Sequence, residues 1–132
     1  MKREEFRETF LSVFANGMKR QQKRKYRIGL EYGGYLWHLF YYKLVPAFIG
    51  DDARKEYDKV DKNGAIQIRY DLGIGYGDEE TSRLEDNFLT AEGIDKGGYS
   101  EFYVIGKDFS WCYIVTHEMD LCGPYFCYAS VI

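Results

Sequence analysis

The segment SEFYVIGKDFSWCYIVTHE, residues 100–118, restricts the fold more than any other part of the chain. Its centre, Gly106-Lys107-Asp108, is typical of a turn, and both flanks are rich in aromatic and β-branched residues that favour strands. It therefore predicts a β-hairpin. The chain as a whole is 18% aromatic, with thirteen Tyr and nine Phe, which favours a fold rich in sheet.

Two further segments have the apolar spacing of a helix. The N-terminal segment ends near Asn16-Gly17, and its apolar face comprises Phe6, Phe10, Val13 and Phe14. The other is expected to start with Asp51 as its N-cap, and its stripe comprises Ala53, Tyr57 and Val60. Ser82 and Glu85 match a capping box and predict a short helix that places Leu84 and Phe88 on one face. Residues 18–27 are either a short helix or a solvated connector.

Strand signals complete the pattern. In NGAIQIRYDL, Ile66, Ile68, Tyr70 and Leu72 should point inward, whereas Gln67, Arg69 and Asp71 should point outward. Tyr35–Leu44 is expected as a strand, and GPYFCYASVI as the last strand. The order predicts a single compact α+β domain over residues 1–132. Its core would be a mainly antiparallel sheet of about four to five strands, with an N-terminal helix and one or two further helices packed on it.

Composition narrows the class of protein. A net charge of −3 argues against a general nucleic-acid binder. The charged N-terminus does not suit a signal peptide, and no apolar run approaches the ~20 residues of a membrane span. Three Cys without a repeated CxxC indicate reduced thiols. We therefore expect a cytoplasmic protein with no membrane segment and no cofactor, either a monomer or a homodimer.

His117 and Glu118 are the first candidates for acid–base chemistry. Alternation along a strand puts Trp111, Tyr113, Val115 and His117 on one face, and Cys112, Ile114, Thr116 and Glu118 on the other. The zinc motif HExxH fails because Leu121 stands where its second His is needed. A structural His117, bonded to a carbonyl or a Tyr, is favoured. The alternative is a small hydrolase or acid–base enzyme in which His117 is the general base, Glu118 or Asp120 orients it, and Cys122 or a water attacks.

His38 and the cysteines are the remaining candidates. His38 and His117 would share a face if their strands paired, with Cys122 or Asp120 completing a set, but no recognised ligand spacing is present and no metal site is predicted. Cys112, Cys122 and Cys127 lie among apolar neighbours and are expected to be buried. Cys122 is the one plausible nucleophile.

Two segments raise the question of anion binding. Gly73, Gly75 and Gly77 follow a predicted strand but match no phosphate fingerprint, and residues 73–97 receive no role. KRQQKRKYR carries six positive charges, at Lys19, Arg20, Lys23, Arg24, Lys25 and Arg27. Only Tyr26 is aromatic there, so nucleic-acid docking is a weak alternative to a solvated helix face. The acidic loop Asp78–Asp86 is an expected intramolecular counterpart.

Several motifs together resemble a known bacterial family. GGYLWHLF, GDDARKEYD, FYVIGKDFSWCYIVTHE and GPYF occur in the order and spacing of the family called domain of unknown function 4275, over roughly residues 30–126. The resemblance implies a small single-domain protein without an established activity. The motif positions are Trp37, His38, Trp111, Tyr113, Thr116, His117, Glu118, Gly123, Pro124, Tyr125 and Phe126. The resemblance implies Thr at position 112, where this chain has Cys, which argues against a catalytic Cys112.

The aromatic excess suggests a binding role. We expect a non-enzymatic module that holds a protein partner or small ligand, with an immunity-type or regulatory role by analogy. Its predicted binding residues are Trp37, His38, Trp111, Tyr113, His117 and Tyr125. The prediction requires Trp37, Trp111 and Tyr125 to form a surface, so it fails if all three are buried.

Overall fold

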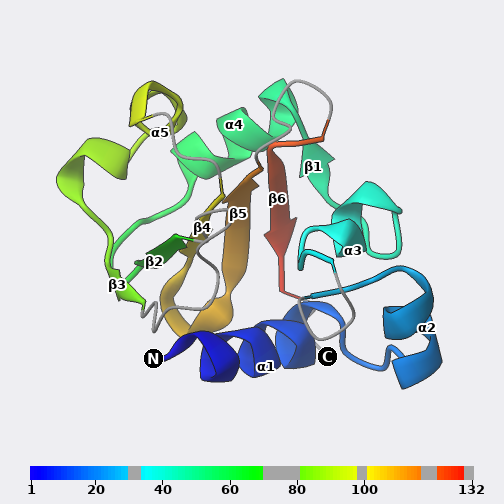
Figure 1. The fold of residues 1–132 in the computed structure, drawn as a ribbon. Coiled ribbons are helices and arrows are strands. Elements are labelled where there is room, and N and C mark those ends of the chain that lie inside the picture. The colour runs from blue at the N-terminus through cyan, green and yellow to red at the C-terminus, as the bar shows by residue number, and fades with distance from the viewer. Residues whose placement is uncertain (30–33, 70–80, 98–100, 117–121, 130–132) are drawn as a thin grey trace.

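The computed structural model describes residues 1–29, 34–69, 81–97, 101–116 and 122–129. Six strands form one antiparallel sheet with the order β1-β6-β5-β4-β2-β3 (Figure 1). The strands are β1 Phe48–Ile49, β2 Ile66–Arg69, β3 Ser82–Arg83, β4 Phe102–Ile105, β5 Trp111–Val115 and β6 Tyr125–Tyr128. The helices are α1 Arg3–Phe14, α2 Arg20–Lys25, α3 His38–Tyr41, α4 Asp51–Lys59 and α5 Ala91–Gly97, and the short 3₁₀ turns are η2 Asp86–Phe88 and η3 Lys107–Phe109.

The predicted hairpin is confirmed as β4 and β5, joined through η3. Phe102 pairs with Val115 and Ile105 with Cys112. Alternation along β5 is also confirmed, because Trp111, Tyr113 and Val115 belong to one core cluster and Cys112 and Ile114 to the other. The two clusters lie on opposite faces of the sheet.

Helices cover both faces of the sheet (Figure 1). On one face α1 packs through fully buried Phe6 and Phe10, whose rings lie 6.1 and 6.0 Å from that of Tyr103. On the other face α4 stacks Tyr57 on Tyr113, with ring centroids 4.3 Å apart. The predicted α+β architecture with an N-terminal helix is therefore confirmed. The sheet has six strands instead of four to five, because the two-residue strands β1 and β3 lie at its edges.

The predicted strand Tyr35–Leu44 is wrong, since its centre is the helix α3. Leu36, Leu39 and Phe40 are buried at i, i+3 and i+4, the spacing that a helix needs to direct them to one core. Lys43 closes the turn with φ 56°, and the Leu44 N–H donates to the Leu39 carbonyl at 3.1 Å. Packing against the core thus overrides the β propensity of the aromatic residues.

Two predictions around β2 are also wrong. Gln67 does not face outward but is buried, because its amide donates to the Glu85 carboxylate and accepts the Glu85 backbone N–H, each at 3.0 Å. Ser82 pairs with Gln67 in β3 instead of starting a helix, so the predicted capping box does not form. The inward positions Tyr70 and Leu72, and the outward Asp71, lie outside the described residues.

The two segments with the apolar spacing of a helix both form helices. The N-terminal segment is confirmed as α1, with Phe6, Phe10 and Phe14 buried. The second predicted helix is α4, but Gly50 occupies its N-cap position and Asp51 is its first residue. No helix in the described part of the chain is both long and apolar enough to cross a membrane.

Candidate binding surface on helices α2 and α3

The basic run centres on the helix α2, and its cations form no ion pair with the described part of the chain. Five of its six cations are exposed, and none of the six forms an ion pair with a described residue. Among the other described cations, Lys59 pairs with Glu56 and Lys96 with Glu92, each at 3.0 Å, and Arg54 pairs with Asp51 and Asp95. The positive charge of α2 is therefore not neutralised by the described part of the fold, including Asp86 of the acidic segment, which lies on η2.

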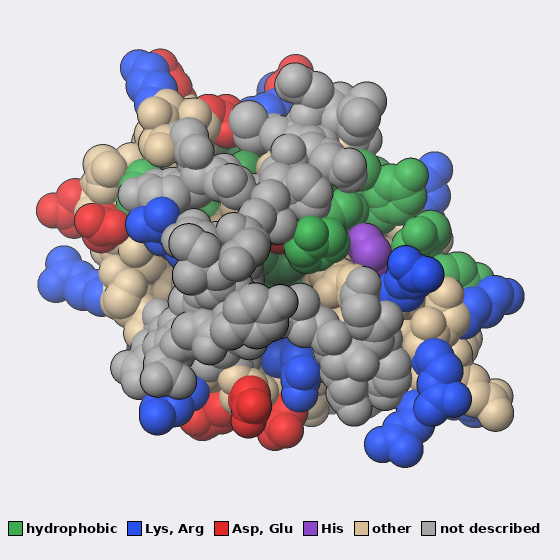
Figure 2. All heavy atoms as spheres, viewed as in Figure 1, with side chains coloured by type: hydrophobic (Ala, Val, Ile, Leu, Met, Phe, Trp, Pro, Cys, Tyr) green, Lys and Arg blue, Asp and Glu red, His purple; other side chains and the backbone are tan. Residues whose placement is uncertain are grey.

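Aromatic rings from α3 lie beside this basic helix. Tyr41 and Tyr42 are 46% and 47% exposed. The Tyr42 ring lies 5.3 Å from Tyr26, 4.9 Å from Tyr41 and 5.6 Å from His38. Figure 2 shows Lys and Arg side chains gathered around a histidine and hydrophobic side chains, over the place where Figure 1 draws α2 and α3. We call the six cations with Tyr26, His38, Tyr41 and Tyr42 the α2–α3 surface.

The end of α2 holds α3 in place through backbone carbonyls. His38 Nδ1 lies 3.2 Å from the Tyr26 carbonyl and 3.0 Å from the Arg27 carbonyl, so Nδ1 carries the proton and donates. Gly34 allows this approach, because a Cβ there would lie 2.1 Å from the Arg27 carbonyl oxygen. Sequence reasoning misses the surface, since it predicts a strand in place of α3 and counts only Tyr26 as aromatic.

The aromatic residues that the sequence predicts as a binding surface are buried. Trp37, Trp111 and Tyr125 are only 2%, 5% and 3% exposed, and Tyr113 is fully buried. Trp37 and Tyr125 belong to the core cluster on one face of the sheet, whereas Trp111 and Tyr113 belong to the cluster on the other. The sheet itself separates these residues, so they cannot together contact a partner. Of the predicted binding residues that the structure describes, His38 alone is partly exposed.

Trp37 has a buried polar partner that the sequence pattern does not single out. Its indole N–H lies 3.0 Å from each oxygen of the Glu101 carboxylate, and Glu101 is 1% exposed. Trp37 also stacks on Tyr125 with centroids 6.5 Å apart, so the motifs GGYLWHLF and GPYF meet in the core. The one signal for Glu101 is its position directly before the apolar run of β4.

The acid–base candidates cannot be assembled from the described residues. His117, Glu118 and Asp120 lie outside them, as do Gly73, Gly75 and Gly77 and the acidic residues 78–80. Thr116, directly after β5, donates its hydroxyl to the carbonyl of Cys122, which precedes β6. Among the described side chains, no cluster of His, Cys, Asp and Glu could hold a metal ion.

The three cysteines are free and buried, as predicted. Burial raises the pKa of the Cys112 thiol well above its usual value, and the neighbouring Cys127 raises it further. Burial also raises the pKa of Cys127 to about 11. Both thiols are therefore protonated at neutral pH and are poor nucleophiles.

We expect the native thiols to react with dithionitrobenzoate far more slowly than the thiols of the urea-unfolded chain. The free energy of unfolding should also fall as the pH rises from about 9 to about 11. In this range an unfolded thiol, with its ordinary pKa of 9.0, loses its proton while folded Cys127 keeps it. Urea unfolding at a series of pH values measures this fall. Cys127→Ala should reduce its slope, and an unchanged slope would contradict the assignment to Cys127.

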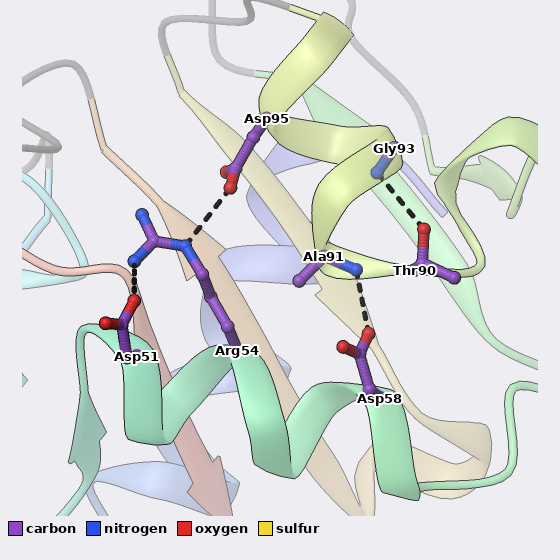
Figure 3. Close-up of polar contacts among 7 residues, drawn as sticks. All are labelled: Asp51, Arg54, Asp58, Thr90, Ala91, Gly93 and Asp95. Atoms are coloured by element: carbon purple, nitrogen blue, oxygen red, sulfur yellow. Dashed lines mark hydrogen bonds and ion pairs between the residues drawn. The ribbon is translucent and has the colours of Figure 1, made fainter.

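Polar contacts join α4 to α5 on the face of the sheet that carries Tyr113 (Figure 3). Arg54 donates through Nε to Asp95 at 3.1 Å and through Nη1 to Asp51 at 2.8 Å. Asp58 accepts the Ala91 backbone N–H at 2.9 Å. On the same face of the sheet, the buried Tyr113 hydroxyl has no hydrogen-bond partner within the described part of the chain.

Tyr113→Phe is expected to raise the free energy of unfolding by about 1 kcal/mol, because it removes a buried hydroxyl without a partner. Tyr57→Phe is the matched control. Tyr57 stacks on Tyr113 and is equally buried, but its hydroxyl donates to the Phe88 carbonyl. Its removal should lower stability by about 1 kcal/mol. Urea denaturation measures both, and a loss of stability for Tyr113→Phe would show that its hydroxyl is bonded in solution.

The fold and surface define a small α+β protein with a basic and aromatic face. The profile of the family described as domain of unknown function (DUF4275) matches residues 3–126, so the chain belongs to that family. The match confirms the resemblance inferred from the motifs and extends it to the N-terminal helix. Comparison with curated proteins and with solved structures found no match.

Proposed function

We propose that this protein is a non-enzymatic binding module of the cytoplasm that holds a partner protein on the α2–α3 surface. The observation that carries the proposal is the exposure of Tyr41 and Tyr42 beside six cations that form no ion pair with a described residue. Tyr and Arg are enriched among the residues that dominate binding energy at protein interfaces. The three free, buried thiols support a reducing compartment.

The described acid–base groups favour binding over catalysis. His38 uses Nδ1 to hold α3 against the carbonyls of Tyr26 and Arg27. Cys112 and Cys127 have raised pKa values, and Cys122 is buried. These groups stabilise the fold around the surface, which suits a rigid docking site more than a reactive one.

The test compares capture from an extract of the source organism by the wild-type protein and the variant Tyr41→Ala/Tyr42→Ala. We expect a partner protein that the wild type retains and the variant loses, because the variant removes the exposed rings. Leu89→Ala is the matched control, since Leu89 is 43% exposed and follows η2, far along the chain from α3. The control should retain the partner.

Thermal unfolding of all three proteins checks that the variants remain folded. The rings of Tyr41 and Tyr42 are half exposed, so their removal should shift the midpoint little. Equal retention of every captured protein by the double variant and the wild type would refute the proposal.

A further inference from the structure

The charge and ring geometry of the α2–α3 surface indicate the chemistry of its partner. We propose that the surface binds an acidic polypeptide segment, with Asp and Glu side chains on the cations of α2 and an apolar side chain against Tyr41 and Tyr42. This inference rests on the proposed function and specifies the partner. Nucleic acid is the alternative polyanion, and the net charge of the rest of the chain and the packing of the rings favour the polypeptide.

The cations that have no described ion pair indicate that the partner is negatively charged. Within residues 19–27 there are six Lys and Arg and no Asp or Glu. Three of these cations occupy the last turn of α2. Because none is paired with a described carboxylate, an incoming acidic group meets no competing ion pair from those residues. Opposite charge would speed the encounter and fix the orientation of the partner.

The charge outside the surface limits the length of the partner. Without these six cations, 12 Lys and Arg remain against 21 Asp and Glu, a net charge of −9 for the rest of the chain. A nucleic-acid strand typically occupies ~4–16 nucleotides on a binding fold, whereas the cations here are confined to nine consecutive residues of a chain that is otherwise net acidic. A short acidic segment can end where the basic surface ends.

Ring packing argues against base stacking. Tyr26 and Tyr42 are tilted by 46°, and Tyr41 and Tyr42 are tilted by 72°. His38 meets Tyr42 edge-on at 76°, and Lys25 Nζ lies 5.4 Å from the Tyr26 ring centroid, over its face. Strand binding by stacking uses ring faces on which successive bases lie. These rings instead pack against one another at steep angles, an arrangement that suits contact with an apolar side chain of a protein.

The side chains of the α2–α3 surface are already ordered, which favours binding of a short segment. His38 holds α3 through two backbone carbonyls, and the rings of Tyr26, His38 and Tyr41 contact that of Tyr42. Rings that are already ordered lose little side-chain entropy on binding. A short segment can therefore bind without a large interface.

Fluorescence anisotropy tests the inference with two labelled probes of equal formal charge. One is a short glutamate-rich peptide carrying tryptophan, and the other is an oligothymidine. We expect the peptide to bind more tightly, and its affinity to fall steeply as salt is added. Arg20→Glu/Arg24→Glu should weaken peptide binding at least about tenfold, and Tyr41→Ala/Tyr42→Ala should also weaken it. Arg83→Glu, a reversal on the exposed edge strand β3, is the matched control and should change it little.

The remaining outcomes overturn the inference. Tighter binding of oligothymidine would identify the partner as nucleic acid. If neither probe binds, or if Arg20→Glu/Arg24→Glu leaves peptide binding unchanged, the acidic-segment inference fails. A partner protein that is captured from extract and lost with Tyr41→Ala/Tyr42→Ala would still support the proposed function in that case, so failure of the inference and failure of the function are distinguishable.

Discussion

Trp37→Ala is expected to lower the free energy of unfolding by about 3–5 kcal/mol, the usual cost of removing a large buried aromatic side chain. The indole is 2% exposed and lies between Tyr35, with centroids 5.3 Å apart, and Tyr125, at 6.5 Å. Its loss leaves a cavity in the core below α3 and takes the indole donor from the buried Glu101 carboxylate. Urea denaturation followed by far-UV circular dichroism measures the change.

Trp37→Phe separates the two contributions. A six-membered aromatic ring remains, so most of the stacking surface is kept, but the pyrrole ring with the N–H that contacts both Glu101 oxygens is lost. Hydrogen bonds to charged groups contribute about 1.5–3 kcal/mol, so this variant should lose roughly that amount. Tyr41→Ala is the control on the same helix, because its ring is 46% exposed and should affect stability far less. A Trp37→Ala protein with wild-type stability and lost partner binding would instead make Trp37 a surface residue.

Gly34→Ala is expected to destabilise the protein by about 1–3 kcal/mol and to disrupt the α2–α3 surface. The new Cβ would lie 2.1 Å from the Arg27 carbonyl oxygen and 2.8 Å from His38 Nδ1. Neither atom can move freely, because the carbonyl is backbone and accepts the His38 proton. Relief of the clash therefore separates α3 from the end of α2. Urea denaturation measures the stability, and the NMR resonance of the His38 Nδ1 proton reports its release from the carbonyls.

Gly17→Ala is the control, because Gly17 is required by its backbone conformation and not by a close contact. Gly17 has φ 82°, and a Cβ added there would have no described heavy atom within 4 Å, so alanine meets backbone strain alone. We expect a loss of about 1–2 kcal/mol with an unchanged resonance of the His38 Nδ1 proton. If Gly34→Ala also left this resonance unchanged, Gly34 would not be needed for the contact between α2 and α3.

The candidate surface shows why sequence reasoning finds half of the site. The six cations lie within nine consecutive residues, so their density is evident from the sequence. Tyr41 and Tyr42 belong to a different segment, which β propensity assigns to a strand. In the folded chain Tyr42 lies beside Tyr26 because Leu36, Leu39 and Phe40 enter the core from a helical turn. Local propensity is too weak to predict that arrangement against the packing of three large side chains.

Local pattern was sufficient for the hairpin, the N-terminal helix and the burial of the thiols. Strand alternation and helical spacing repeat over short distances, and each depends on backbone geometry alone. Packing between distant segments determined the rest. It put Trp37 and Trp111 on opposite sides of one sheet, buried Gln67 against Glu85, and left Tyr41 and Tyr42 exposed beside α2. Which aromatic residue is core and which is surface depends on the elements that cover it, and those elements lie elsewhere in the chain.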